Sequence, residues 1–213
     1  MEAVKQRILD SKIIAIVRGI DSDKILPTCK ALYEGGVDCI EVTFNQSSET
    51  CIDDTARAIK NIADNMPEIC VGAGTVMTVE QTEAAVKAGA KYIISPNFDE
   101  EVVKKTLELG VLSIPGVLTP TEITNAYQKG AAFAKVFPAG NFGLGYIKAI
   151  RSPVSHIPML AVGGVNADNV KDFMAAGIQG VGVGSSLVNK KLINEGRFDE
   201  ITALAKRFVE NVK

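Results

Sequence analysis

The sequence predicts an α/β protein whose architecture is a (β/α)8 barrel, also called a TIM barrel. Along the whole chain, short runs of β-branched and apolar residues alternate with stretches whose apolar residues recur at helical spacing. A glycine separates each of five helical stretches from the β-rich run that follows it. A unit of strand, loop, helix and loop takes about 20 to 25 residues. Eight such units fill the 213 residues, at the short end of the range for this barrel.

Eight strands are predicted in chain order, each a β-rich run bounded by glycine, proline or polar residues. They cover residues 13–18, 39–44, 70–76, 92–96, 112–117, 133–138, 159–165 and 180–187. The stretches between them, such as TVEQTEAAVKAGA and EEVVKKTLELG, have the spacing of amphipathic helices. The glycine in EGGVDCIEV, KAGAKYIIS, ELGVLSIPG, QKGAAFAKV and AAGIQGVGV fits the left-handed position that ends a helix.

An open, doubly wound sheet is the alternative arrangement of alternating strands and helices. That fold usually carries a GxGxxG motif after its first strand, whereas the first predicted strand here runs into VRGIDSD. No linker, low-complexity segment or change of composition divides the chain. We therefore expect residues 1–213 to form a single barrel domain.

Composition narrows the choice of partners and compartment. With a formal net charge of −2, the chain offers no electrostatic reason to expect nucleic acid or a membrane surface as a partner. No apolar run approaches the roughly 18 residues of a membrane span, and the N-terminal MEAVKQRILDSK lacks a signal-peptide core, so a cytoplasmic protein is expected. The four cysteines form no CxxC pair, which favours reduced structural thiols: Cys29, Cys39, Cys51 and Cys70.

Residues at the C-terminal ends of the predicted strands are the candidate functional groups, because barrels place their active sites there. Arg18, Thr75 and Pro96 lie at the C-terminal ends of three of these strands. Glu41 and Lys135 lie within two others, and strand alternation separates each from the small or branched neighbours that would pack on the helices. Both side chains are therefore expected to point into the barrel.

An interior glutamate and an interior lysine have two interpretations. They could form a buried ion pair that fixes the packing of the barrel. Alternatively, a lysine desolvated beside Phe133 and Phe137 has a lowered pKa, and its neutral amine can attack a ketone to form a Schiff base. A neighbouring carboxylate can then transfer the protons that this chemistry requires.

The last two predicted strands end in VGGVNADN and GVGSSL. Gly163 and Gly164 in the first motif, and Gly184 and Ser185 in the second, would bring backbone N–H groups and a hydroxyl to an anion. Barrels commonly bind phosphate at these two loops, although turns also require glycine for structural reasons. His156 is the only histidine and is expected on the surface, and the acidic stretches indicate helix caps, so no metal or histidine mechanism is supported.

The motifs IEVTF, VGAGTV, ISP, IPG, AKVFP, GGV and GVGSSL, in this order and spacing, resemble those of the bacterial 2-keto-3-deoxy-6-phosphogluconate (KDPG) and 4-hydroxy-2-oxoglutarate (KHG) aldolases. The resemblance runs from Ile13 to about Leu187. It implies a class I pyruvate aldolase on a (β/α)8 barrel, needing no metal or other cofactor and usually a homotrimer. Its substrates would be a phosphorylated keto-deoxy sugar acid and pyruvate.

The resemblance also implies roles for individual residues. Lys135 falls on the Schiff-base lysine and Glu41 on the proton-transferring carboxylate. Arg18 and Thr75 would hold the pyruvate carboxylate, and Pro96 and Phe137 would line the pyruvyl pocket. The phosphate would be bound by the glycine-rich positions near the C-terminus: Gly163, Gly164, Gly184 and Ser185.

Two positions depart from the common pattern of this family. Asn45 stands where many members have arginine, so binding of the carboxylate would depend on Arg18. Val162 stands where many have threonine before the double glycine. These features are similar to those of the related phosphogalactonate aldolases, which leaves the C4 configuration of the substrate open. More distant alternatives are a phosphate-binding barrel isomerase, a metal-dependent pyruvate aldolase and a non-catalytic phospho-sugar sensor.

Overall fold

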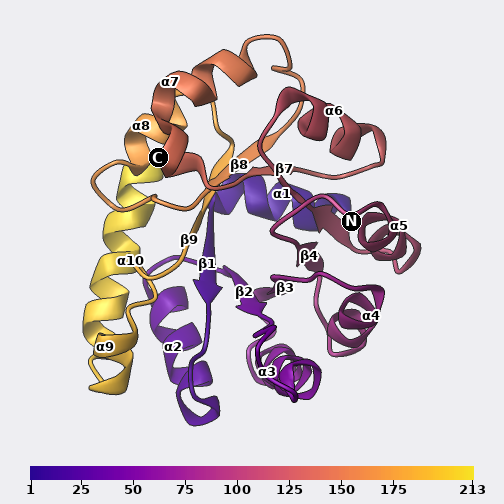
Figure 1. Cartoon of the computed structure of the whole chain (residues 1–213). Coiled ribbons are helices and arrows are strands. Elements are labelled where there is room, and N and C mark those ends of the chain that lie inside the picture. Colours follow the sequence, from indigo (N-terminus) through magenta and orange to yellow (C-terminus); the bar gives the residue numbers. More distant parts are fainter.

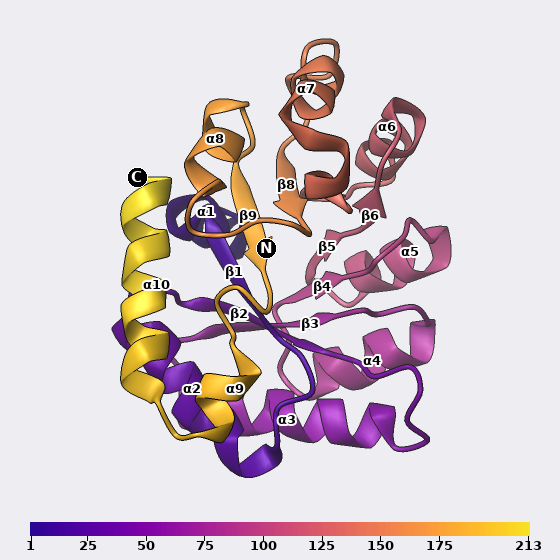
Figure 2. The same cartoon turned by 60° about the vertical axis from the view of Figure 1, so that its left-hand side comes forward.

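The computed structural model describes all residues from 1 to 213 and contains one parallel sheet of nine strands. The order of hydrogen-bonded strands is β5-β4-β3-β2-β1-β9-β8-β7-β6. Figures 1 and 2 show this sheet curled into a barrel surrounded by helices. The strands are β1 Ile13–Val17, β2 Cys39–Thr43, β3 Cys70–Gly74, β4 Tyr92–Ile94, β5 Leu112–Ile114, β6 Gly116–Val117, β7 Ala134–Val136, β8 Met159–Val162 and β9 Gly180–Val183.

The ends of the sheet, β5 and β6, are two halves of one barrel strand that Pro115 interrupts. Proline has no N–H group to donate to a neighbouring strand, but the Pro115 carbonyl still accepts a 2.9 Å hydrogen bond from the Lys135 N–H. Because β5 pairs with β4 and β6 pairs with β7, the two halves join the opposite edges of the sheet. The predicted (β/α)8 barrel is thereby confirmed.

Ten helices accompany the strands. They are α1 Glu2–Ser11, α2 Ser22–Glu34, α3 Cys51–Asn65, α4 Val79–Lys87, α5 Glu100–Glu108, α6 Pro120–Gln128, α7 Ala139–Arg151, α8 Val170–Ala175, α9 Lys190–Asn194 and α10 Phe198–Val212. Helix α10 packs against both α2 and α8 and so completes the outer ring. None of the helices combines the length and the apolar composition that a membrane crossing requires.

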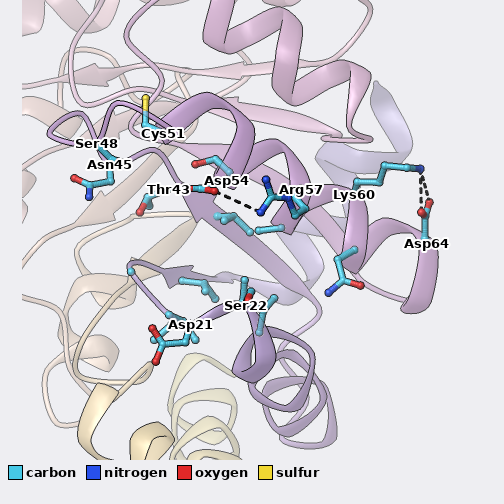
Figure 3. Close-up of a pocket in the computed structure, with 18 residues that line it drawn as sticks. Asp21, Ser22, Thr43, Asn45, Ser48, Cys51, Asp54, Arg57, Lys60 and Asp64 are labelled. Carbon is cyan, nitrogen blue, oxygen red and sulfur yellow. Dashed lines mark hydrogen bonds and ion pairs between the residues drawn. The ribbon is translucent and has the colours of Figure 1, made fainter.

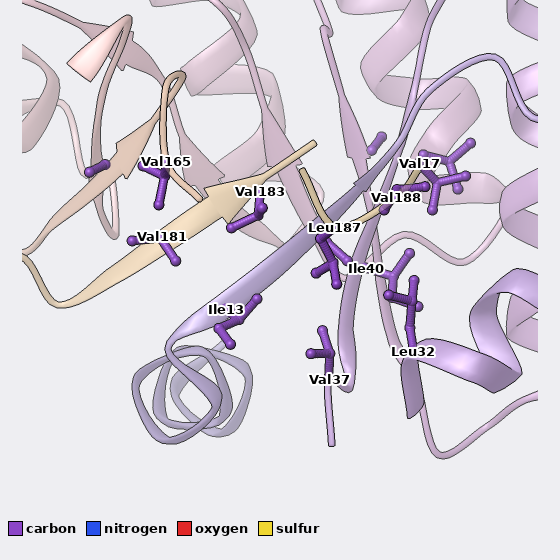
Figure 4. Close-up of a cluster of buried hydrophobic side chains, with 14 of the residues drawn as sticks. Ile13, Val17, Leu32, Val37, Ile40, Val165, Val181, Val183, Leu187 and Val188 are labelled. Atoms are coloured by element: carbon purple, nitrogen blue, oxygen red, sulfur yellow. The ribbon is translucent and has the colours of Figure 1, made fainter. Parts of the chain in front are cut away.

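Strand alternation divides the buried apolar residues into two clusters. One face of each strand belongs to the larger cluster, which also contains buried residues of the helices; Figure 4 shows Ile13, Ile40 and Val181 in this cluster. The other face fills the barrel, where Ile14, Cys39 and Tyr92 are joined by apolar residues of α1.

Tyr92 is fully buried, and Gly72 opposite it has no side chain because a β-carbon there would overlap the tyrosine ring. Helix α1 contacts β1, β2 and β9, and its Ile8 is buried in the cluster that fills the barrel. The N-terminal half of the barrel is therefore packed.

The predicted strands begin within one residue of the observed ones, but most extend too far at their C-terminal ends. Thr75 has a left-handed backbone with φ +56°, and Gly163 has φ +89°, so both residues leave the extended conformation of the sheet. Arg18 and Pro96 likewise follow their strands and belong to the loops. The residues singled out as strand ends thus stand at the rim of the barrel, after the observed last residues of their strands.

Candidate active site

A cavity of about 480 Å³ opens at the C-terminal end of the barrel. It brings together residues contributed by β1, β2, β7 and the loops that follow β3, β4, β8 and β9. All ten candidate residues from the sequence line it: Arg18, Glu41, Thr75, Pro96, Lys135, Phe137, Gly163, Gly164, Gly184 and Ser185.

Lys135 is the middle residue of β7 and is only 6% exposed. Its Nζ atom lies 5.1 Å from the centre of the Phe137 ring, and Phe133 beneath it is completely buried. Burial lowers the pKa of Lys135 because a low-dielectric surrounding disfavours the ammonium. The nearby Glu41 opposes this shift, and the Arg18 cation adds to it.

Glu41 is the middle residue of β2 and is 2% exposed. Its neighbour across the β3 register is Gly72, and a β-carbon on Gly74 would overlap its carboxylate oxygen. The absence of a side chain at Gly74 of VGAGTV therefore makes room for the Glu41 carboxylate. Burial raises the pKa of Glu41, while the positive charges of Lys135 and Arg18 act in the opposite direction.

Glu41 and Lys135 do not form the buried ion pair that the alternative interpretation required. Neither residue belongs to any of the ion pairs of the chain, so the nitrogen and the carboxylate oxygens lie more than 4.0 Å apart. Both side chains instead line the cavity. Since burial shifts both groups toward their neutral forms, the cavity offers an amine and a carboxyl group that can exchange protons with a bound molecule.

Arg18 and Thr75 are joined directly, because Arg18 Nη2 donates a 3.0 Å hydrogen bond to Thr75 Oγ1. A second hydrogen bond supports the strained backbone of Thr75, because Gln46 Nε2 donates to the Thr75 carbonyl at 2.7 Å. Gln46 is in turn held by the buried Gln81, whose Nε2 donates to Gln46 Oε1 at 2.9 Å. A cation and a hydroxyl are thus fixed beside each other at the rim.

The loops after β8 and β9 are also held in place. The Gly163 carbonyl accepts a 2.8 Å hydrogen bond from the N–H of Gly140, and a β-carbon on Gly164 would come within 2.9 Å of the Gly140 Cα. Ser186 Oγ donates to the Val165 carbonyl at 2.8 Å and ties the two loops together. Ser185 also lines the cavity and is exposed, and its hydroxyl makes no hydrogen bond within the chain that would compete with a ligand.

Several residues that line the cavity were not predicted from the sequence. Ile16 and Gly182 face the cavity, and strand alternation from Ile14 and Gly180 could have found them. Asn166 also lines the cavity, but its sequence signal was that of a turn, and its Oδ1 does accept hydrogen bonds from two N–H groups of that turn.

Asn45 lies elsewhere. It lines a larger cavity of about 710 Å³ outside the barrel, between the start of α2 and the length of α3 (Figure 3). The charged residues of this outer cavity include two ion pairs, Arg57–Asp54 and Lys60–Asp64. None of the ten candidate residues lines it. Val162, the other departure from the family pattern, does line the cavity that contains Lys135.

Comparisons with known proteins agree on one family. The family model for KDPG and KHG aldolase matches residues 4–204. The chain is 34% identical to the 2-dehydro-3-deoxy-6-phosphogalactonate aldolase of Escherichia coli, over 94% of this chain and 96% of the relative. It is 36% identical to the KHG/KDPG aldolase of the same organism, over 88% and 86% of the two chains.

A solved structure of KDPG aldolase from Legionella pneumophila, with pyruvate captured as a covalent carbinolamine intermediate, is similar with a TM-score of 0.85. The two proteins are 27% identical, and the similarity covers 95% of this chain and 96% of the other. The sequence resemblance is therefore confirmed: this chain belongs to the KDPG and KHG aldolase family.

Proposed function

We propose that this protein is a class I aldolase that cleaves 2-dehydro-3-deoxy-6-phosphogluconate to pyruvate and D-glyceraldehyde 3-phosphate. It would also cleave 4-hydroxy-2-oxoglutarate to pyruvate and glyoxylate. One observation carries the proposal: a buried lysine with a lowered pKa and no ion-pair partner faces a buried glutamate across the cavity of this barrel. Membership of the aldolase family supports it.

In the proposed mechanism, the neutral amine of Lys135 attacks the C2 carbonyl of the substrate to give a carbinolamine. Glu41 gives its proton to the departing hydroxyl, and loss of water then gives a protonated imine, which accepts the electron pair of the C3–C4 bond as that bond breaks. The Glu41 carboxylate formed in this way accepts the proton of the C4 hydroxyl, directly or through water, and the aldehyde leaves. The resulting enamine takes a proton at C3, and hydrolysis of the imine releases pyruvate and regenerates the amine.

The remaining residues would hold the substrate. Arg18 and Thr75 offer a guanidinium and a hydroxyl, joined at 3.0 Å, to the carboxylate next to C2. Pro96 and Phe137 would line the pyruvyl pocket. The glycine-rich loops after β8 and β9 would bind the phosphate through backbone N–H groups and a hydroxyl. These loops contain Gly163, Gly164, Gly184 and Ser185.

The phosphogalactonate substrate is a second candidate, favoured by one observation. Val162 replaces a threonine common in the family, lines the cavity, and leaves one hydroxyl fewer to distinguish the two configurations at C4. The phosphogalactonate aldolase of E. coli is also among the relatives reported above. Parallel cleavage assays on the two 6-phosphorylated epimers decide which is the better substrate.

We further propose a homotrimer located in the cytoplasm. The resemblance of the motifs to those of the family supports the trimer, and membership of that family supports the cytoplasmic location. The mass of the assembled protein in solution, measured by light scattering after size-exclusion chromatography, tests the trimer against the 22.6 kDa of one chain.

Reductive trapping tests the proposed mechanism. Incubation with pyruvate and borohydride should attach one reduced pyruvyl group, located on Lys135 by peptide mass mapping. Lys135→Ala should lose both the adduct and the cleavage of substrate. Cleavage by a protein in which Lys135 remains unmodified under trapping conditions would overturn the mechanism.

A further inference from the structure

The catalytic cavity continues into a second recess of about 450 Å³, where the loops after β1 and β9 meet. Four residues line both spaces: Ile16, Arg18, Gly184 and Ser185. The residues that line only the second recess come from the segment after β9: Val188, Asn189, Lys190 and Lys191. A ligand that contacts Ser185 from the catalytic cavity is therefore at the entrance of this recess.

The charges of the recess have one sign. Arg18, Lys190 and Lys191 line it, and no carboxylate does. None of these three cations belongs to an ion pair. The outer cavity between α2 and α3 differs, because its charged residues include the ion pairs of Arg57 and Lys60. Cations gathered without anions in a concave surface attract an anionic ligand.

The structure places the Lys190 ammonium group at the rim of the barrel. Its Nζ atom lies 2.9 Å from the point that a β-carbon on Gly19 would occupy, next to Arg18. Gly19 has φ +57°, a conformation that suits glycine, so the same residue forms the turn and leaves space for the lysine.

The backbone that carries Lys190 is well supported. The Asn189 side chain accepts hydrogen bonds from the N–H groups of Lys191 and Leu192, at 3.0 and 3.3 Å. Ile193 is fully buried, and Lys24 of α2 donates a 3.2 Å hydrogen bond to Asn194. The lysine therefore extends over the rim from a fixed base, and only its side chain has to move to contact a ligand.

We propose that Lys190 binds the terminal phosphate of the substrate and gives the protein its preference for phosphorylated keto-deoxy acids. This inference rests on the proposed function, which places the phosphate at Gly184 and Ser185. Those loops supply N–H groups and a hydroxyl but no cation, and Arg18 is engaged with Thr75 near the proposed carboxylate position. Lys190 supplies the positive charge that a phosphate dianion requires.

Steady-state kinetics of Lys190→Met test the proposal. The KM for the 6-phosphorylated substrate should rise about tenfold, because a charge-assisted contact is lost, while kcat stays within about twofold. The KM for 4-hydroxy-2-oxoglutarate, which has no phosphate, should change by less than about twofold. Lys190→Arg should restore most of the affinity for the phosphorylated substrate. Lys171→Met is the matched control, since Lys171 is an exposed lysine of α8 that lines neither cavity.

Inorganic phosphate serves as an independent probe. It should inhibit the wild type competitively, and Lys190→Met should weaken this inhibition by a similar factor. An unchanged KM for the phosphorylated substrate, or an equal rise for both substrates, would refute the role of Lys190. Trapping of pyruvate on Lys135 separates this result from the proposed function, because pyruvate has no phosphate and its adduct should form equally in wild type and Lys190→Met.

Discussion

The Nζ atom of Lys135 lies 5.1 Å from the centre of the Phe137 ring, which is itself 39% exposed. The sequence suggested that Phe133 and Phe137 both exclude water from the lysine. The structure divides this task, because Phe133 belongs to the packed interior of the barrel and Phe137 stands at the mouth of the cavity. The amine is therefore desolvated from below and accessible from above, which is the arrangement that a nucleophile requires.

This arrangement predicts how formation of the imine depends on pH. Burial lowers the pKa of Lys135, so the rate of pyruvate trapping should rise with pH and reach half its maximum below about 10.4, the pKa of a free lysine. The measurement is the rate of adduct formation on Lys135 between about pH 5 and pH 10. A midpoint near that of free lysine would show that the amine is not desolvated in solution.

The same shift affects stability. The unfolded chain binds the lysine proton more tightly than the folded chain does, so the free energy of unfolding should rise with pH between the lowered pKa and about 10.4. Lys135→Met removes this dependence of the free energy of unfolding on pH. At pH values below the lowered pKa of Lys135, this variant should be more stable than wild type, because it does not bury an ammonium group. Urea unfolding at several pH values measures the difference.

Glu41→Gln tests proton transfer separately from imine formation. The amide keeps the shape of the side chain but cannot accept a proton, so the cleavage rate should fall on the order of 10²-fold or more. Exchange of the methyl protons of pyruvate should fall in parallel, while borohydride still traps pyruvate on Lys135. Methyl exchange at a near-normal rate would assign the base to another group.

Ser185→Asp tests the proposed phosphate site. A carboxylate at this position repels a phosphate, so the KM for phosphorylated substrates should rise at least about tenfold more than the KM for 4-hydroxy-2-oxoglutarate. Ser155→Asp adds the same charge at an exposed position that lines neither cavity and is the matched control. Equal losses on both substrates would indicate that the loop has only a structural role.

Gln46→Ala tests the support of Thr75. Loss of the 2.7 Å hydrogen bond to the Thr75 carbonyl should let the strained backbone relax and move its hydroxyl away from Arg18. The pyruvate concentration that gives half-maximal trapping should then rise about three- to tenfold. The rate at saturating pyruvate should stay near that of wild type.

Asn45→Ala is the neighbouring control, because Asn45 lines the outer cavity and its Oδ1 accepts a hydrogen bond from the Ser47 N–H, not from Thr75. The same rise in both variants would mean that the loop as a whole, and not the Gln46 hydrogen bond, sets the affinity.

The sequence by itself determined the barrel and the inward direction of Glu41 and Lys135. Both follow from local rules: alternation along a strand fixes which side chains share a face, and glycines mark the ends of helices. The same rules located the strand starts within one residue, as β2 and β3 show. Motifs at the rim, such as GGV and GVGSSL, indicated candidate residues that the structure brings into one cavity.

Only the tertiary structure decided how residues distant in the sequence meet. It separates the Glu41 carboxylate from the Lys135 ammonium by more than an ion-pair distance. It supports Thr75 through a hydrogen bond from Gln46 and places the Lys190 side chain over Gly19. It also places Asn45 outside the cavity that contains Lys135. These distances depend on the closure of the barrel and on how the loops after different strands pack. The periodicity of a strand cannot supply them, because it specifies the direction of each side chain but not the separation between two strands.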